Sequence, residues 1–297
     1  MRMNRRDFIQ KSALGAGAAL LAPPLARAAA GETYDPFERV RLGKSGLVVT
    51  RTCLGTGMHG GGRASDHTRM GQENFTALVR GAYDRGVRLF DLADLYGTHR
   101  FFAKAFEGIP RDSYALITKI WVRPGGIPEK ERPDADAVIE RFLKELNTDY
   151  IDLVLLHCME SKDWPAEQRR HMDKMAALKE KGVIRAQGVS CHTVEALETA
   201  AAEPWVDSVH ARINPEGVAM DKPPERVPAV LKRLHEAGKG VVGMKIIGEG
   251  RFTEAERREK SLRYVLGLGC VDILNVGFEK IEEIDDLVGR VRQIKKA

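Results

Sequence analysis

The sequence predicts an α/β protein: a (β/α)8 barrel, the TIM-barrel architecture, preceded by a β-hairpin. Apolar strand-like runs alternate with helix-like segments eight times along the 297-residue chain. Several of these runs are almost continuously apolar, as parallel strands covered on both faces are. The segments between them are long enough for crossover helices. Eight such units in a row are typical of a closed barrel and favour it over a doubly wound sheet.

The predicted elements can be placed in chain order. Segment 39–49, RVRLGKSGLVV, has two short alternating runs around Gly-Lys-Ser-Gly, which predicts the hairpin. The barrel strands are predicted at 51–57, 87–93, 114–120, 150–158, 184–192, 206–214, 240–247 and 271–278. The helices are predicted at 73–85, 99–107, 135–146, 168–181, 194–202, 225–237, 254–267 and 281–295. No linker interrupts 36–297, so we predict a single domain there.

The first 28 residues predict an export signal rather than part of the fold. A charged start is followed by a short Gly/Ala/Leu run at 13–22, two prolines, and the small-residue site Ala26-Arg27-Ala28. The segment NRRDFIQK at 4–11 resembles the twin-arginine export motif, and the alternative is a chance arginine pair in an ordinary secretion signal. We therefore expect the twin-arginine export machinery as a partner and cleavage near Ala28. The mature protein would be periplasmic or otherwise exported.

Charge and apolar length argue against two classes of partner. The formal net charge is +5, and residues 1–28 contribute +4 of it. The remaining chain is nearly neutral, so we expect no nucleic-acid partner. The apolar run of the signal is too short to span a bilayer, and we expect no stable membrane anchor.

Polar side chains gather where the predicted strands end. Asp91 and Tyr96 follow the second barrel strand, Lys119 lies on the third, and His157 ends the fourth. The chemistry of a barrel belongs at the carboxyl ends of its strands, because their loops meet over one mouth. Each residue alone has a structural explanation, such as a capped turn or a core histidine. Together, on adjacent strands, they predict an acid–base site.

This combination fits the reduction of a carbonyl group. A carbonyl that receives hydride needs a proton donor at its oxygen as negative charge develops. Tyrosine has an unperturbed pKa near 10, and a neighbouring ammonium lowers that pKa by favouring the phenolate. We therefore expect Asp91 to position Lys119, Lys119 to tune Tyr96, and His157 to orient the carbonyl.

At this point the chain resembles the aldo-keto reductase superfamily over nearly all of 36–297. The matching segments are the hairpin, LGTG, FDLADLYG, ITK, YIDLVLLH, GVSCH and RINP. The resemblance implies a barrel that acts as an NAD(P)-dependent oxidoreductase on a small carbonyl or alcohol substrate. It implies a catalytic tetrad of Tyr96, Lys119, Asp91 and His157.

The resemblance also implies a cofactor site. Its candidate residues are Thr56 and Gly57 of LGTG, Ser190, Cys191, His210, Met244, Lys245, Arg251, Glu279 and Lys280. Relatives usually have Ser-Asn at 190–191, a glutamine at 210, and often an aromatic ring at 244. Acidic residues dominate 277–287, where NADPH-specific relatives carry basic ones, which favours NAD over NADP. An exported enzyme of this kind would need to keep its cofactor tightly bound.

Three alternatives remain open from the sequence. The first is a metal site built from His157-Cys158 and Cys191-His192, although successive strand residues point in opposite directions. The second is a non-catalytic or regulatory barrel with weakened cofactor binding. The third concerns Cys158 and Cys191, whose expected adjacency allows a disulfide. The tetrad favours the enzyme, and we predict no metal.

Overall fold

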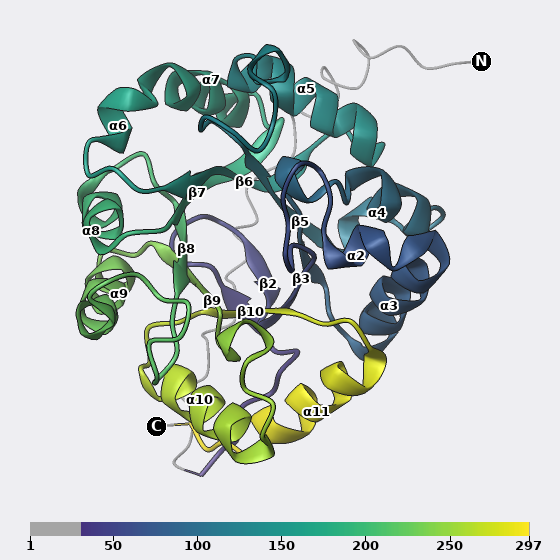
Figure 1. Ribbon diagram of the computed structural model, residues 1–297, viewed down its shortest axis with the longest axis vertical. Helices are drawn as coiled ribbons and strands as arrows, with labels where there is room; N and C mark the ends of the chain where they lie inside the picture. Colours follow the sequence, from purple (N-terminus) through teal and green to yellow (C-terminus); the bar gives the residue numbers. More distant parts are fainter. Residues whose placement is uncertain (1–30, 297) are drawn as a thin grey trace, which may run out of the picture.

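Within residues 31–296, which the computed structural model describes, eight parallel strands close into a barrel surrounded by helices (Figure 1). The strand order is β10-β3-β4-β5-β6-β7-β8-β9. The strands are β3 (Thr52–Gly55), β4 (Leu89–Asp91), β5 (Ala115–Ile120), β6 (Ile151–Met159), β7 (Ile184–Cys191), β8 (Ser208–Arg212), β9 (Gly240–Met244) and β10 (Ile273–Gly277). The predicted (β/α)8 barrel is confirmed. The predicted signal at 1–28 lies outside the described residues.

The N-terminal hairpin covers the amino-terminal end of the barrel. Its strands β1 (Arg39–Arg41) and β2 (Val48–Thr50) pair antiparallel, as predicted. Leu42, Leu47 and Val49 of the hairpin pack in one cluster with side chains of the barrel interior, among them Leu89 and Ile117. The hairpin therefore closes this end with apolar side chains, and the opposite end stays available for chemistry.

The helices form the outer layer, and their buried faces pack on the barrel. The longer ones are α3 (Gly71–Arg85), α4 (His99–Ala105), α5 (Ala135–Leu146), α7 (Arg169–Glu180), α8 (Val194–Ala202), α9 (Val227–Glu236), α10 (Ala255–Gly267) and α11 (Ile281–Val291). The short helices α2 (Asp66–Arg69) and α6 (Trp164–Glu167) were not predicted, because one turn leaves no periodic pattern. Asn147, with a φ of 50°, ends α5 in the left-handed conformation that often terminates helices.

Most strands are shorter than their apolar runs predict. β4 ends at Asp91 and β9 ends at Met244, so the apolar residues that follow each strand belong to loops over the barrel mouth. Among residues 31–296, no helix is both long and apolar enough to cross a membrane.

Candidate active site

A buried cluster of charge lies at the carboxyl ends of the central strands. Asp91 is the last residue of β4, and Lys119 comes from the neighbouring strand β5. The Lys119 Nζ lies 2.5 Å from Asp91 Oδ1 and also donates to the carbonyl oxygen of Leu92 at 3.0 Å. Asn275 of β10 donates from Nδ2 to the other oxygen, Asp91 Oδ2, at 2.7 Å. Both Asp91 oxygens are thus engaged, which satisfies a buried carboxylate.

Tyr96 stands over this cluster on the short 3₁₀ turn η1 (Asp94–Tyr96). The Lys119 Nζ lies 4.8 Å from the centre of the Tyr96 ring. A side chain on Gly57 or Gly60 would collide with that ring, since a Cβ would come within 2.3 Å and 2.6 Å of it respectively. Gly55, Gly57 and Gly60 have the Gly-x-Gly-x-x-Gly spacing of a dinucleotide-binding turn. In this barrel the second and third of these glycines make room for Tyr96.

Two arginines clamp the turn that carries Tyr96. Asp94, which is almost fully buried, accepts from Arg63 Nε at 2.9 Å and from Arg141 of α5 at 2.6 Å. Arg141 also pairs with Glu145 at 3.0 Å. The turn is therefore tied to the outer helix layer by charge-assisted hydrogen bonds, which restrict where the Tyr96 hydroxyl can lie.

His157 faces the hydroxyl of Tyr96 from β6. Its Nε2 lies 3.4 Å from Tyr96 Oη, and the two rings meet edge-on with centroids 5.5 Å apart. Trp121 also packs edge-on against the His157 imidazole, with ring centroids 5.4 Å apart. Burial, together with the charge of Lys119, holds the pKa of His157 well below its ordinary value. The imidazole is therefore neutral at physiological pH.

The direction of the Tyr96 pKa differs from the sequence expectation. Burial raises the pKa of Tyr96 well above 10, and the carboxylate of Asp91 adds to the rise. The ammonium of Lys119 does not reverse this rise, because its charge is paired with the Asp91 carboxylate. A raised pKa keeps Tyr96 protonated at neutral pH, so it can donate a proton.

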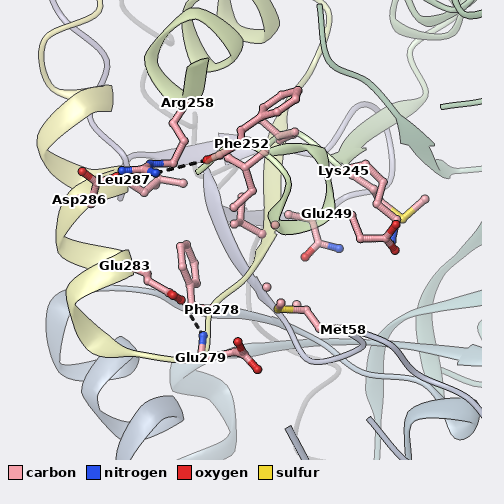
Figure 2. A pocket seen from close by; sticks show the side chains of 18 of the residues that line it. Met58, Lys245, Glu249, Phe252, Arg258, Phe278, Glu279, Glu283, Asp286 and Leu287 are labelled. Carbon is pink, nitrogen blue, oxygen red and sulfur yellow. Dashed lines mark hydrogen bonds and ion pairs between the residues drawn. The ribbon is translucent and has the colours of Figure 1, made fainter. Parts of the chain in front are cut away.

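A cavity of about 610 Å³ begins at this cluster and extends to α11. Asp91 and Tyr96 line one end of it, beside Gly55, Gly57 and Met58. The end of β10, the β9–α10 loop and helices α10 and α11 form the remaining walls. The charged residues that line them are Lys245, Glu249, Arg258, Glu279, Glu282, Glu283, Asp286 and Arg290. Figure 2 shows the Lys245–Glu249 pair at one side of this cavity and Arg258 near Asp286 at the other.

The structure divides the predicted cofactor residues into two groups. Gly57, Met244, Lys245 and Glu279 line the cavity. The residues outside its lining are Thr56, Ser190, Cys191, His210, Arg251 and Lys280.

Three of the residues outside the lining contact Asp91 or the backbone at the end of β6. Thr56 donates from Oγ1 to the carbonyl oxygen of Asp91 at 2.9 Å. Ser190 Oγ accepts from the backbone N–H of Cys158 at 2.8 Å. His210 is fully buried, with Nε2 at 3.7 Å from Asp91 Oδ1. Burial lowers the pKa of His210 to about 3, although the Asp91 carboxylate opposes this.

Sequence reasoning missed several residues that the structure brings to the site. Asn275 reaches Asp91 from the last strand of the barrel, and Met58, Phe252 and Arg258 line the cavity. The only sequence signal for Asn275 was a polar residue inside the apolar run at 271–278. Arg258 lies on a helix whose charged residues resemble an ordinary solvated face.

The cysteines and histidines at the strand ends do not converge on a metal. Within residues 31–296 no group of three or more His, Cys, Asp or Glu side chains is arranged to hold a metal ion. Cys158 and Cys191 are both free thiols in the structure. Cys158 Sγ instead lies 3.3 Å from His192 Nε2.

Comparisons with known proteins identify the family of the chain. The model of the aldo/keto reductase family matches residues 51–287. The aldo-keto reductase AFTS1 of Alternaria alternata is 26% identical over 260 residues, covering 76% of this chain and 70% of that protein. The methylglyoxal reductase DkgB of Salmonella typhimurium is 28% identical over 151 residues, and this match spans about half of each chain, 48% and 51%.

Solved structures share the fold. An aldo-keto reductase from Klebsiella pneumoniae in complex with NADPH superposes with a TM-score of 0.66 at 18% identity, covering 86% of this chain and 90% of that one. The family acts on small carbonyl compounds by NAD(P)-dependent oxidoreduction. The chain belongs to the aldo/keto reductase family.

Proposed function

We propose that this protein transfers hydride between a nicotinamide cofactor and a carbonyl or alcohol carbon, with Tyr96 as the general acid and base. The observation that carries the proposal is the position of the Tyr96 hydroxyl. It lies 3.4 Å from His157 Nε2, and the ring beneath it covers the buried Lys119–Asp91 pair. A reacting oxygen placed beside both groups would meet a proton donor and an imidazole.

The cavity fits an elongated dinucleotide. Its volume of about 610 Å³ lies within the range of cofactor pockets, and it leads from Tyr96 to α11. Gly277 also lines the cavity. A Cβ at this position would come within 2.6 Å of Met58, so only glycine fits here. Met244 and Phe252 supply apolar surface, and Lys245 supplies a cation. When bound, the cofactor supplies or accepts the hydride.

Each member of the tetrad has a distinct role in this proposal. In reduction, Tyr96 gives its proton to the carbonyl oxygen, and its raised pKa ensures that the proton is present. The neutral His157 stands beside the same oxygen and fixes its orientation. Lys119 faces the ring of Tyr96 and stabilises the phenolate that proton loss creates, while Asp91 holds Lys119 in place.

We propose NAD(H) rather than NADP(H) as the cofactor. The far end of the cavity is lined by Glu279, Glu282, Glu283 and Asp286. Arg258 and Arg290 are present there, but both pair with Asp286, at 3.0 Å and 2.7 Å. An unpaired excess of carboxylates repels a phosphate dianion and can accept hydrogen bonds from ribose hydroxyls.

We also propose export by the twin-arginine route with the cofactor already bound. Free nicotinamide nucleotides are scarce outside the cytoplasm, so an exported enzyme would oxidise one substrate and reduce another on one retained cofactor. Retention for hours corresponds to a dissociation constant of roughly nanomolar or below at ordinary association rates. Native mass spectrometry of freshly isolated mature protein, before and after dialysis, tests this. Absence of nucleotide at the start, or its rapid loss, would contradict the proposal.

Replacing Tyr96 by phenylalanine tests the proposed chemistry. We expect Tyr96→Phe to lower kcat for carbonyl reduction on the order of a hundredfold or more, because only the proton donor is removed. Cofactor affinity, measured by fluorescence titration, should stay nearly unchanged. Full activity in this variant would remove Tyr96 as the acid.

A further inference from the structure

A chain of polar side chains leaves the active site along the barrel mouth. It starts at Cys158, which directly follows His157, and continues through His192 after β7 to Arg212, the last residue of β8. Cys158 Sγ lies 3.3 Å from His192 Nε2, and His192 Nδ1 lies 2.5 Å from Arg212 Nη2. Arg212 Nη1 then lies 3.3 Å from Asp221 Oδ1 in the loop before α9. The chain therefore crosses the carboxyl ends of three neighbouring strands.

The backbone at Cys158 is unusual for a site with no function. Cys158 has a φ of 62°, in the left-handed region that is unfavourable for a residue with a Cβ. Its N–H is held by Ser190 Oγ at 2.8 Å. Strained conformations of this kind persist only where the surroundings impose them, and they gather at functional sites. The turn begins the chain of contacts that leads from His157 to Arg212.

The hydrogen-bond pattern fixes the protonation of His192. A guanidinium can only donate, so Nδ1 of His192 must accept from Arg212. The proton of the neutral ring is then on Nε2, which points at the sulfur of Cys158. Burial and the neighbouring charge of Arg212 lower the pKa of His192 to about 2. His192 therefore orients the guanidinium without neutralising its charge.

The counter-ion of Arg212 is incomplete. Its contact with Asp221 is a single one at 3.3 Å. Asp221 Oδ2 and Arg212 Nε are both buried and have no hydrogen-bond partner within the described part of the chain. Burial raises the pKa of Asp221 to about 6, against the opposing effect of Arg212. A buried carboxylate in a good bidentate pair would be fully engaged.

Asp152, at the other end of the barrel, shows what a complete pair looks like. It accepts from Arg111 at 2.6 Å, from Arg185 at 2.9 Å and from the N–H of Leu116 at 2.9 Å. Arg212 has no comparable carboxylate, although its guanidinium carries more donors than its two contacts use. Its charge acts on both Tyr96 and Cys158, where it opposes the rise in their pKa values caused by burial. Arg212 is thus a cation with unused N–H donors, and its charge acts on the proton donor Tyr96.

We propose that Arg212 binds a carboxylate of the substrate, so that the enzyme acts on oxo acids and the corresponding hydroxy acids. This inference rests on the proposed function of the same site. A substrate carboxylate would take up the unused donors of the guanidinium in a bidentate, charge-assisted contact. His192 and the turn at Cys158 hold Arg212 at a fixed place relative to His157, so the bound carbonyl is presented to Tyr96. Arg212 is then a specificity-determining residue and takes no part in the proton transfer.

The test compares each acid with its uncharged methyl ester. Glyoxylate, pyruvate and succinic semialdehyde are assayed against their methyl esters with the enzyme carrying reduced cofactor. We expect kcat/KM for at least one acid to exceed that of its ester by roughly tenfold to a hundredfold, the range for a hydrogen bond to a charged group. If the wild-type protein shows the same kcat/KM for each acid and its ester, the inference is overturned without any variant.

Three variants separate a direct contact from a general effect of charge. Arg212→Met should remove the preference for the acid through a higher KM, with the ester changed less than about twofold. Arg212→Lys should keep part of the preference, because it retains the charge. Arg226→Met removes an exposed cation that pairs with Glu198 and should leave the preference intact. Equal losses for acid and ester in Arg212→Met would overturn the assignment.

The outcomes also distinguish this inference from the proposed function. Ester reduction without any preference for the acid would reject the role of Arg212 and leave hydride transfer standing. Failure to reduce any of the six compounds while simple uncharged aldehydes are still reduced would also reject the role of Arg212. Failure to reduce those aldehydes as well would contradict the proposed function itself.

Discussion

Gly57 lies directly against the ring of Tyr96. A Cβ at position 57 would approach the ring atom Cζ to 2.3 Å, closer than any real contact allows. The glycine and the tyrosine come from loops after different strands, β3 and β4, so the barrel brings them together. The position of the proton donor is therefore set partly by the absence of a side chain on a neighbouring loop.

We predict that Gly57→Ala displaces Tyr96 and lowers kcat on the order of a hundredfold, since small misplacements of a reacting group are costly. Gly61→Ala is the matched control, because a Cβ there meets no atom within 4 Å. Steady-state kinetics of both variants, with circular dichroism to confirm folding, provide the measurement. Equal activity in the two variants would show that Tyr96 does not depend on this contact.

A second prediction concerns the pH dependence set by Lys119. Protonated Tyr96 is the acid in reduction, so a higher pKa of Tyr96 extends reduction to higher pH, and oxidation, which needs the phenolate, rises with pH. Lys119→Met removes a positive charge near the ring, which raises the pKa of Tyr96 further. We expect much slower turnover and a pH optimum moved upward. An unchanged pH–rate profile would count against the pairing.

The same Lys119 change should also lower the free energy of unfolding. Lys119 is fully buried, and its loss leaves the Asp91 carboxylate without its cation. Breaking a buried pair in this way is expected to destabilise the fold by about 3–5 kcal/mol. The double variant Lys119→Met/Asp91→Asn should regain part of this, which urea denaturation would measure. No recovery would indicate that the lost stability comes from packing.

Glu145 on α5 gives a prediction for acid stability. It accepts from His99 Nδ1 at 2.9 Å and from Arg141 at 3.0 Å. Although burial opposes it, these partners lower the pKa of Glu145 from 4.5 to about 2. A depressed folded-state pKa contributes stability above the unfolded pKa of 4.5, and this contribution is lost as the pH falls through about 2.

Glu145→Gln should therefore lower the free energy of unfolding near neutral pH by up to about 3 kcal/mol. The difference from wild type should shrink as the pH is lowered from about 4.5 towards 2. Glu140→Gln, an exposed residue of the same helix that pairs with Lys144, is the control and should change stability little. Denaturation curves at several pH values decide this, and a difference independent of pH would contradict it.

The acidic wall of the cavity predicts cofactor choice. Glu279→Gln combined with Glu282→Gln removes two carboxylates from the lining. We expect the affinity for NADP(H) to rise relative to NAD(H) by roughly tenfold, because repulsion of the additional phosphate decreases. Asp285→Asn is the matched control, because Asp285 lies on the same helix as Glu282 but outside the cavity lining. Parallel changes for both cofactors would exclude this electrostatic discrimination.

Local sequence patterns predicted the elements well, because periodicity and chain breakers act over short distances. Helix α5 begins at Ala135 and ends at Leu146 as its apolar spacing predicts, and the eight strands lie within or next to their predicted runs. The tetrad could be named because strand ends in a parallel barrel meet at one mouth. Family resemblance added the cofactor site, and the structure places four of its ten candidate residues in the cavity lining.

What the sequence determined by itself is the barrel, its hairpin, and the residue types that meet at the mouth. The tertiary structure alone decided the environment of those residues. Asn275 reaches Asp91 across 184 positions of sequence, and no local pattern carries such a contact. Burial and the Lys119–Asp91 pair together reversed the expected direction of the Tyr96 pKa. A pKa depends on burial and on all nearby charges, and these are known only once the chain has closed around them.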